Sequence, residues 1–556
     1  MESGVKEGVI VQASDQSYTF ATFDGMQVAT IYKTLEFFGR KGLLTLPNGM
    51  IAPTEFPVTP GSTFILVEKQ PKEPPWFSDH EKLPSPSSLA NSVEAMKKYF
   101  GIEVPVYDMC RTSAPATPLP LLVEAFGMYV SCCKAYELDA MDWGFVQNMM
   151  AMSTFYDDES LRQSDIARFL EAYLLSALPQ FRFKVSKSRQ GFSEPDICVE
   201  VLTVDGDYVL VAMFDVKPEM GLRGEPSIEA MKYFSDHAAR NYKQKHWSCL
   251  RSCCPVLIVE VVGATIRVGG SALLDKPCYQ PFTPYLHIFR FLQDQGHWEV
   301  LSRALGAIRM AIASLADFYR KLEVESRGND VIRRADSVIW PSPIRQEERN
   351  KHAKVIQYER QLTRSALQVM NVGRQKQLLF YLSYPDGQQR IIKFCQRYGD
   401  KVHALWAEKG FAPQFHLAQL QGSWLVIDME FYCEEDGWRP LIALDPHLFV
   451  SGDDKANKYR LQNHEWEKCK LDVKRAYEDV HDLNPLFVHG DMRRQNILYN
   501  VENSKVAFID FDWAGTDGQD KYPLFLNPLN SWPPGVMRCA VMKSEHDAQL
   551  LNIELG

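Results

Sequence analysis

The segment 486–512 constrains the fold of this chain more than any other part of the sequence. A short apolar run leads into His489 and Asp491, and Asn496 follows Asp491 by five residues. A second apolar run then ends in Asp510. Two buried strands that each carry polar groups into the loop behind them would bring these side chains to one place. We therefore expect a C-terminal domain built around this pair of loops.

The polar residues of this segment match the parts of a phosphoryl-transfer centre in order and in spacing. In such a centre a loop aspartate accepts the proton of the attacking hydroxyl, while an asparagine and a later aspartate hold Mg²⁺ over the phosphates of ATP. Asp491 is thus the predicted catalytic residue, and Asn496 and Asp510 are predicted to bind magnesium and the nucleotide. The pattern predicts a kinase-like domain over 340–556.

Lys393 is the predicted phosphate-gripping lysine of the same domain. It lies in a strand-like run that follows the turn at 385–387. Its acidic partner on the next helix can be either Asp400 or Glu408. The region before Lys393 holds Gly373 but no G-x-G-x-x-G, so the usual flexible cover over the phosphates is missing or replaced. No A-P-E segment follows, which makes ordinary phosphorylation of proteins a poor expectation.

A second acidic pattern lies much earlier in the chain. Asp196 opens a strand-like run, and the next run ends in Asp215-Val216-Lys217. Side chains two apart on a strand point to the same side, so Asp215 and Lys217 can face one site that Asp196 reaches from the neighbouring strand. Hydrolysis of a phosphodiester needs carboxylates on a divalent metal and a cation near the developing charge. We predict a catalytic group in which Asp196 and Asp215 bind magnesium beside Lys217; the alternative is a surface ion pair.

Glu171 is a fourth candidate for this catalytic group. It lies on an amphipathic helix that we expect to begin after Ser164-Asp165. An equally good interpretation is a solvated glutamate on the outer face. Basic residues also gather in this region and would favour contacts to the phosphates of double-stranded DNA with little sequence preference, unless they form a solvated helix face. They are Lys184, Lys187, Arg189, Lys232, Arg240, Lys243, Lys245, His246 and Arg251.

The composition is that of a globular chain. Hydrophobic residues make up 46% and charged residues 24% of the chain. A length of 556 residues is enough for three domains, each with a core of its own. The formal net charge of −9 excludes a protein that coats nucleic acid along its whole length.

No run is apolar and long enough for a membrane span, and residues 1–7 are not followed by the apolar core of a signal peptide. The twelve cysteines are expected to be reduced thiols. A disfavoured alternative is a zinc site formed by His246, Cys249, Cys253 and Cys254.

The earlier acidic pattern resembles the PD-(D/E)xK nuclease fold, and more closely the nuclease domain of fungal Crinkler-type effectors. The resemblance rests on 194–197, on 214–217 and on the strand-like run 254–260. Such domains often carry Gln-x-x-x-Tyr on the intervening helix, where this chain has Glu229 and Tyr233. The His-Gly-Asp and Asp-Phe-Asp forms of the C-terminal pattern look like those of the aminoglycoside or choline kinase branch.

These resemblances imply a multidomain chain of α/β and α+β architecture. A small ubiquitin-like α/β module would span 1–75, a restriction-endonuclease-like α/β/α nuclease domain with a helical first part would span 76–325, and the kinase-like domain would span 340–556. Membership of the Crinkler family implies secretion, here by an unidentified route, followed by action in the host cell nucleus. There, magnesium-dependent DNA cleavage would promote cell death.

We further predict that the kinase-like domain binds ATP and regulates the nuclease, and that host nuclear proteins are partners. Two alternatives stay open. One is an active kinase, for proteins or small molecules, whose degenerate nuclease domain is used to bind DNA. The other is a non-enzymatic scaffold that binds host proteins.

Overall fold

The computed structural model describes most of the chain from residue 118 onward and isolated strands before it. The described residues are 9–12, 17–20, 42–45, 63–68, 107–108, 118–156, 159–187, 195–204, 206–219, 226–244, 246, 248, 252–274, 277–289, 295–326, 357–361, 378–383, 389–419, 424–434, 436–447, 459–524, 526–528 and 530–556. The chain divides into two compact units, Met1–Lys82 and Leu83–Gly556. None of the described helices is long and apolar enough to cross a membrane.

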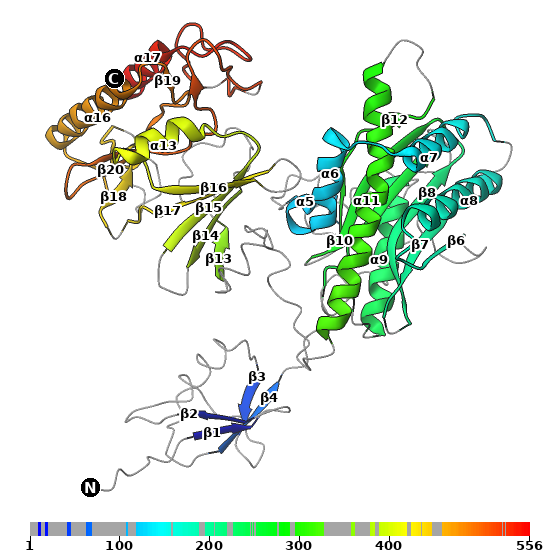
Figure 1. Ribbon diagram of the computed structural model, residues 1–556. Helices are drawn as coiled ribbons and strands as arrows, with labels where there is room; N and C mark the ends of the chain where they lie inside the picture. The colour runs from blue at the N-terminus through cyan, green and yellow to red at the C-terminus, as the bar shows by residue number, and fades with distance from the viewer. Residues whose placement is uncertain are drawn as a thin grey trace. The chain divides into compact units, whose positions relative to one another are not determined.

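The first unit contains a mixed four-stranded sheet (Figure 1). Its strands are β1 (Val9–Gln12), β2 (Ser17–Phe20), β3 (Gly42–Thr45) and β4 (Thr63–Glu68). The order is β2-β1-β4-β3, with β1 and β4 parallel in the centre and each outer strand antiparallel to its neighbour. The helix that the sequence suggests near 28–38 lies outside the described residues.

A second mixed sheet forms the centre of the region 107–326. Its strands are β5 (Tyr107–Asp108), β6 (Phe183–Lys187), β7 (Ile197–Leu202), β8 (Tyr208–Lys217), β9 (Val256–Val262), β10 (Thr265–Leu273), β11 (Pro277–Pro281) and β12 (Leu286–His287). They lie in the order β5-β11-β10-β9-β8-β7-β6, with β12 paired to β10. β6, β7 and β8 are antiparallel neighbours, whereas β8 and β9 are parallel. The parallel pair requires a crossover, and the helix that follows β8 provides it.

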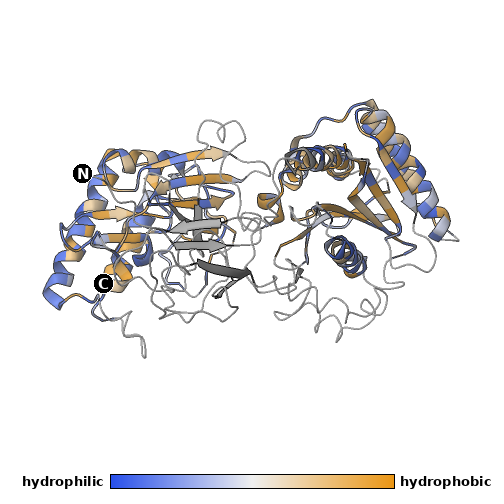
Figure 2. Ribbon diagram, turned by 90° about the horizontal axis from the view of Figure 1, so that it is seen from below, coloured by the Kyte–Doolittle hydropathy of each residue, from blue (hydrophilic) through white to orange (hydrophobic). Residues whose placement is uncertain are grey.

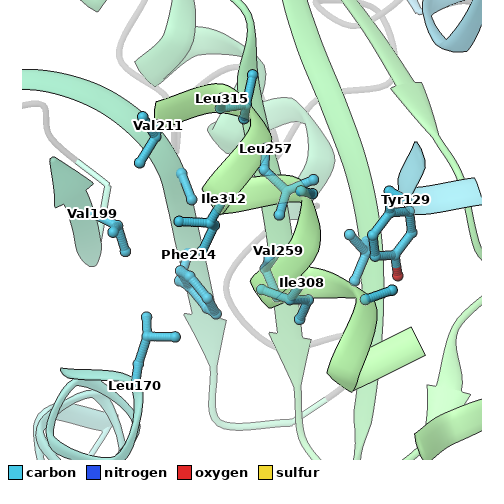
Figure 3. Packing of buried hydrophobic residues seen from close by; sticks show 14 of the residues in the cluster. Tyr129, Leu170, Val199, Val211, Phe214, Leu257, Val259, Ile308, Ile312 and Leu315 are labelled. Atoms are coloured by element: carbon cyan, nitrogen blue, oxygen red, sulfur yellow. The ribbon is translucent and has the colours of Figure 1, made fainter. Parts of the chain in front are cut away.

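The helices of this region are α5 (Leu119–Leu122), α6 (Glu124–Ala135), α7 (Ala140–Ala151), α8 (Glu159–Ala177), α9 (Pro226–Lys243) and α11 (Gln295–Ser326). One apolar core joins α8 and α11 to the sheet: Phe214 of β8 and Val259 of β9 face Ile308 and Ile312 of α11 (Figure 3). In Figure 2 the strands of this sheet are mostly apolar, while the helices mix apolar and polar residues. Because side chains alternate along β8, the residues next to Phe214 point to the opposite face.

A buried polar network ties three of these helices together. Asp142 of α7 is completely buried and accepts hydrogen bonds from the hydroxyls of Tyr136, at 2.8 Å, and Tyr173 of α8. Arg309 of α11 donates to the same carboxylate at 3.0 Å. These three donors satisfy the buried Asp142 side chain, and the Asp142 side chain in turn is their shared acceptor.

We expect Asp142→Ala to lower the free energy of unfolding by ~3 kcal/mol, because two tyrosine hydroxyls lose their acceptor and Arg309 keeps only the exposed Asp139 as its acid. Urea denaturation of the two proteins measures this difference. Glu137→Ala is the matched control, since Glu137 is a nearby exposed acid, and it should change the free energy by less than about 0.5 kcal/mol. Equal stability of the Asp142 variant and wild type would contradict the structural role of the network.

The C-terminal region begins with an antiparallel sheet and one helix. The strands β13 (Gln357–Gln361), β14 (Leu378–Ser383), β15 (Gln389–Cys395), β16 (Phe415–Gln419) and β17 (Leu425–Glu430) have the order β13-β14-β15-β17-β16. Helix α13 (Asp400–Glu408) lies between β15 and β16 in the chain. Its buried residues, among them Trp406, join the core of the following, more helical part.

That helical part contains the segment 486–512 with its pattern of polar residues. Its elements are β18 (Trp438–Pro440), α14 (Leu441–Leu444), α16 (Asn463–Leu483), β19 (Phe487–Val488), a 3-10 turn (Arg494–Asn496), β20 (Ile497–Asn500), β21 (Val506–Phe508), β22 (Gly515–Thr516) and α17 (Ser544–Leu555). β20 and β21 form a hairpin, and β19 pairs with β22. The loops that follow β19 and β21 are therefore held close together.

Candidate active sites

The loop after β19 brings Asp491 and Asn496 into direct contact. The amide nitrogen of Asn496 donates to the Oδ2 atom of Asp491 at 2.7 Å and to its backbone carbonyl at 2.9 Å. Both side chains are buried. The 3-10 turn that starts at Arg494 folds the chain back, so that Asn496 reaches Asp491 although it lies five residues later in the chain. A carboxylate held this way can accept a proton from a hydroxyl group that reaches it.

Arg493 is a member of this site that the sequence analysis missed. Its Nη2 atom lies 2.6 Å from the Oδ2 atom of Asp491, and its Nε atom donates to the other oxygen. Burial alone would lower the pKa of Arg493, but the hydrogen bonds to Asp491 and its charge raise it. Arg494 turns away from the site and pairs with Asp445. Two arginines in succession were the available signal, yet sequence spacing does not say which of them faces the carboxylate.

Lys393 of β15 is buried between two carboxylates from the loop after β21. Its Nζ atom is 2.5 Å from the Oδ1 atom of Asp510 and 2.6 Å from that of Asp512. The Asp512 contact is a charge contact whose geometry is not that of a directed hydrogen bond. Burial would lower the pKa of Lys393, and the two acids raise it. Asp510 has a φ of +71°, a left-handed backbone that is uncommon for aspartate and is found at functional loops.

Neither of the two acids expected to partner Lys393 from α13 does so. Asp400 and Glu408 are both exposed. The buried side chains of this helix are Val402, His403, Trp406 and Ala407. Lys393, Asp510, Asp491 and Asn496 are thus gathered in the C-terminal region by β15 and the two loops, without a helix acid. Gly373 lies outside the described residues.

Asp547 of α17 holds the catalytic loop by its backbone. Its carboxylate accepts the N–H of His489 at 2.5 Å and the N–H of Gly490 at 2.9 Å. Gly490 has a φ of +78°, which a glycine adopts without strain. Burial raises the pKa of Asp547 to about 7, while the two N–H groups oppose that shift. The loop that carries Asp491 is therefore anchored by a residue far along the chain.

We expect Asp547 to make the stability of this region depend on pH. An acid whose pKa rises on folding, here from 3.8 to about 7, contributes stability that is present at low pH and is lost as the pH rises through this interval. Asp547→Asn should flatten this part of the profile, in addition to a constant loss of ~1–3 kcal/mol from one unpaired backbone N–H. Urea denaturation at about pH 5, 6 and 7 measures the slope. Glu545→Gln, an exposed acid on the same helix, should leave it unchanged.

The hairpin β7-β8 brings Asp196, Asp215 and Lys217 together. The Oδ2 atom of Asp196 accepts the N–H of Val216 at 2.7 Å, so the start of β7 is locked to β8. The Nζ atom of Lys217 is 3.5 Å from the Oδ1 atom of Asp215 and 2.7 Å from the Oε2 atom of Glu229. Burial raises the pKa of Asp196 to about 6 and that of Asp215 well above its ordinary range, and Lys217 opposes both shifts.

Two further residues position this group. Glu229 lies on α9, so this helix covers the face of the sheet that carries Lys217, opposite to Phe214. Tyr233, one turn further along α9, has its pKa raised by burial and then by the nearby acids. Behind the strand, the Nη1 atom of buried Arg162 donates to the carbonyls of Lys217, at 3.1 Å, and Pro218, at 3.3 Å. Arg162 thus fixes the end of β8.

The structure does not bring Glu171 to the other three predicted residues. Helix α8 starts at Glu159, ahead of the expected start after Ser164-Asp165, and Glu171 is exposed in its second half. Besides burial, which is the largest cause, the charges of Glu159 in its first turn and of Glu229 raise the pKa of Asp196. At 1.5 Å per residue, Glu159 and Glu171 are about 18 Å apart along the helix. The predicted helix start after Ser164-Asp165 was too late, so Glu159 was not considered as a candidate.

Asp215 fits a site for a divalent cation. Both of its carboxylate oxygens are buried and have no hydrogen-bond partner, and Lys217 approaches only Oδ1, at 3.5 Å, so a bound divalent cation would satisfy this costly buried charge. No set of three or more His, Cys, Asp or Glu side chains within the described ranges is arranged to hold a metal ion. Two carboxylates are enough for Mg²⁺, which commonly keeps several waters and takes further oxygens from a phosphate substrate. Asp196 and Asp215 would hold it.

The basic residues near this site differ in their surroundings. Lys184 pairs with Glu200 at 2.9 Å, and buried Lys232 pairs with Asp236. Arg240 and Lys243 are exposed near the end of α9. The side chains of Lys187, Arg189, Lys245 and Arg251 lie outside the described residues. Of the suggested zinc ligands, Cys249 is also outside them, and the ring of His246 contacts the hydroxyl of Ser248 at 2.7 Å.

Residues 403–517 match the family model described as the phosphotransferase enzyme family, APH. The match begins in α13 and includes Asp491, Asn496 and Asp510, while Lys393 precedes it. This part of the chain is a kinase-like phosphotransferase domain. The prediction of a kinase-like C-terminal domain is thereby confirmed. Asp196, Asp215 and Lys217 lie outside the matched residues.

Among solved structures, this chain is similar to the kinase PK-1 of the Cydia pomonella granulovirus. The two chains share 13% sequence identity, and the similarity covers 38% of this chain and 72% of the viral kinase with a TM-score of 0.29. No curated protein matches this chain.

Proposed function

We propose that the phosphotransferase domain transfers the γ-phosphoryl group of ATP to a hydroxyl group. The observation that carries this proposal is the convergence of two pairs, Asp491 with Asn496 and Lys393 with Asp510, whose loops are joined by the backbone hydrogen bond from Ile509 to Asn496 at 2.9 Å. Asn496 and Asp510 would hold Mg²⁺, which when bound neutralises the charge of the β- and γ-phosphates. The acceptor would be a small molecule or a protein, and ATP binding by the domain would also regulate the rest of the chain.

Each residue of the site has a separate role in this reaction. Asp491 accepts the proton of the acceptor hydroxyl at a carboxylate oxygen as the hydroxyl oxygen attacks the γ-phosphorus, the bond to the β,γ-bridging oxygen breaks and ADP leaves. Arg493, held against Asp491, places its guanidinium where negative charge develops on the transferred group. Lys393 orients the phosphates of ATP from the floor of the site. The buried setting strengthens each of these charge contacts.

Calorimetric titration of the purified chain with ATP tests this function. Binding is expected with magnesium and is expected to weaken strongly when the metal is chelated. A turnover assay that follows ADP formation with and without candidate acceptors then separates transfer to an acceptor from transfer to water. Absence of nucleotide binding under all these conditions would reject the proposal.

We propose as a second function that the region 118–326 hydrolyses phosphodiester bonds of double-stranded DNA. The specific observation in its favour is the buried Asp215 carboxylate, without a hydrogen-bond partner, beside Asp196 and Lys217. The element order α8-β6-β7-β8-α9-β9 also supports a restriction-endonuclease-like arrangement. Magnesium, held by the two aspartates, would activate a water. Lys217 would stabilise the charge on the attacked phosphate, and exposed Arg240 and Lys243 would contact the backbone without reading bases.

Incubation of the chain with plasmid and linear DNA tests the nuclease. We expect cleavage in magnesium, none in a chelator, and similar rates on DNA of unrelated sequence. Adding ATP shows whether the phosphotransferase domain regulates cleavage. Intact DNA in every arm would leave the nuclease-like region as a DNA-binding or scaffold unit and would reject catalysis.

The effector role is a proposal that rests on the family resemblance. A Crinkler-type protein would be secreted by an unidentified route, enter the host nucleus, bind nuclear proteins and promote cell death. A ubiquitin-like module at the N-terminus is supported by the sheet order β2-β1-β4-β3 with parallel central strands. Fluorescence microscopy of the tagged chain in host cells tests the location: nuclear signal is expected, and exclusion from the nucleus would reject this role.

A further inference from the structure

Helix α13 offers the phosphoryl-transfer centre no acid. In protein kinases the strand lysine is held by an ion pair with a glutamate of the following helix, and catalysis requires this pair. The acids of α13 are Asp400 and Glu408, and both are exposed. Lys393 is nevertheless among the most completely buried cations of the described residues, with 3% of its side chain exposed. A buried ammonium needs a fixed counter-charge, so another acid must provide it.

The side chain that α13 does place near the centre is His403. Its ring lies parallel to Phe415 of β16, with 4.0 Å between centroids, and to Phe511, with 4.3 Å. Its Nε2 atom lies 2.9 Å from the carbonyl of Pro413 and its Nδ1 atom 2.7 Å from the hydroxyl of Tyr398, so Nε2 donates and Nδ1 accepts. Burial lowers the pKa of His403 to about 3, which keeps the ring neutral.

This stack fixes the segment that carries both acids. Phe511 lies between Asp510 and Asp512 in the chain, and its ring also contacts His489, with 5.0 Å between centroids. The backbone around Phe511 is therefore held from two sides by neutral rings. Helix α13 therefore positions Asp510 and Asp512 by packing on Phe511. The ion pairs with Lys393 are made by these two aspartates and not by a residue of the helix.

Of these two acids, Asp510 has the predicted role of magnesium ligand. Asp512 is two residues further on and lies 2.6 Å from Lys393. Only 26% of its side chain is exposed, so the contact is shielded from water. With Asp510 engaged by a metal, Asp512 remains as the acid that can hold the ammonium in place.

We infer that Asp512 is the positioning residue of Lys393, in the role that a helix glutamate has in protein kinases. This inference rests on the proposed phosphotransferase function. It predicts that the domain needs no acid from α13, and that Asp512 acts on ATP only through Lys393.

A double-mutant cycle tests the inference. Asp512→Asn should raise the KM for ATP and lower kcat/KM by ~10²-fold, because Lys393 is no longer held at the phosphates. In a Lys393→Met background the same change should cost less than about twofold, because a residue that acts only through Lys393 has nothing left to position. Asp400→Asn and Glu408→Gln are matched controls that should leave both constants within about twofold.

Three outcomes would overturn the inference. The first is a full loss from Asp512→Asn in the Lys393→Met background, which means that Asp512 acts independently. The second is an increased magnesium requirement of Asp512→Asn at an unchanged KM for ATP, which makes Asp512 a metal ligand. The third is a large loss from Glu408→Gln or Asp400→Asn.

If turnover is slow, the affinity for ATP of the single and double variants can be compared in place of kcat/KM. The melting temperature of each variant shows whether it is folded. If the wild type binds ATP but Asp512→Asn and Lys393→Met change its affinity for ATP independently, the inference is rejected and the proposed function stands. Wild type that binds no ATP rejects the proposed function, and the inference with it.

Discussion

Replacing Asp491 by asparagine is expected to lower the rate of phosphoryl transfer by ~10²–10⁴-fold, the contribution of a general base. An amide cannot accept the proton of the attacking hydroxyl. Its carbonyl oxygen can still accept the hydrogen bonds that Asn496 and the Nη2 atom of Arg493 now donate to Oδ2, at 2.7 and 2.6 Å, and only the contact from the Nε atom of Arg493 is lost. Steady-state measurement of ADP formation gives the rate, and calorimetry gives the affinity for ATP, which should change little.

The matched control for this substitution is Asp479→Asn, which changes an exposed acid of α16 in the same domain. It should leave both the rate and the affinity as they are. A variant at Asp491 that keeps more than about a tenth of the wild-type rate would contradict the role of Asp491 as the base. Such a result would favour a regulatory, nucleotide-sensing domain over an enzyme.

Asp215→Asn should abolish DNA cleavage, with an expected loss of ~10³-fold or more, because a metal supplies several kcal/mol of charge stabilisation in such reactions. The same substitution should not destabilise the metal-free protein. Both oxygens of Asp215 are buried without a hydrogen-bond partner, so removing the charge removes a desolvation cost. Lys217 keeps its contact to Glu229 at 2.7 Å. Gel assays of plasmid cleavage and urea denaturation without metal measure the two effects.

Asp207→Asn is the control for the nuclease experiment, because Asp207 lies in the turn of the same hairpin and is largely exposed. Cleavage by this variant should equal that of wild type. Two results count against the assignment: cleavage by Asp215→Asn at more than about a tenth of the wild-type rate, or a strong loss of its stability. The second would mean that Asp215 serves the fold as an ion-pair partner of Lys217.

Short sequence patterns were sufficient to predict the groups of residues that are close in the chain or on one hairpin. The alternation of side chains along β8 places Asp215 and Lys217 on one face, and the turn after β7 brings Asp196 beside Val216. The spacing of Asp491 and Asn496 likewise spans a single loop. Such patterns work because backbone geometry over a few residues is set by local sterics and hydrogen bonding.

The partners of these residues were decided by packing between distant elements. Asp547 reaches the catalytic loop from the last helix, and Lys393 meets acids that lie more than a hundred residues later. Periodicity also cannot locate a helix start to within a turn, so the start predicted after Ser164-Asp165 left Glu159 outside the expected helix. The sequence by itself determined which residue types gather on each strand and loop. The tertiary structure alone decided which acid each cation pairs with, because burial of the surrounding apolar faces selects among acids that are equivalent in sequence.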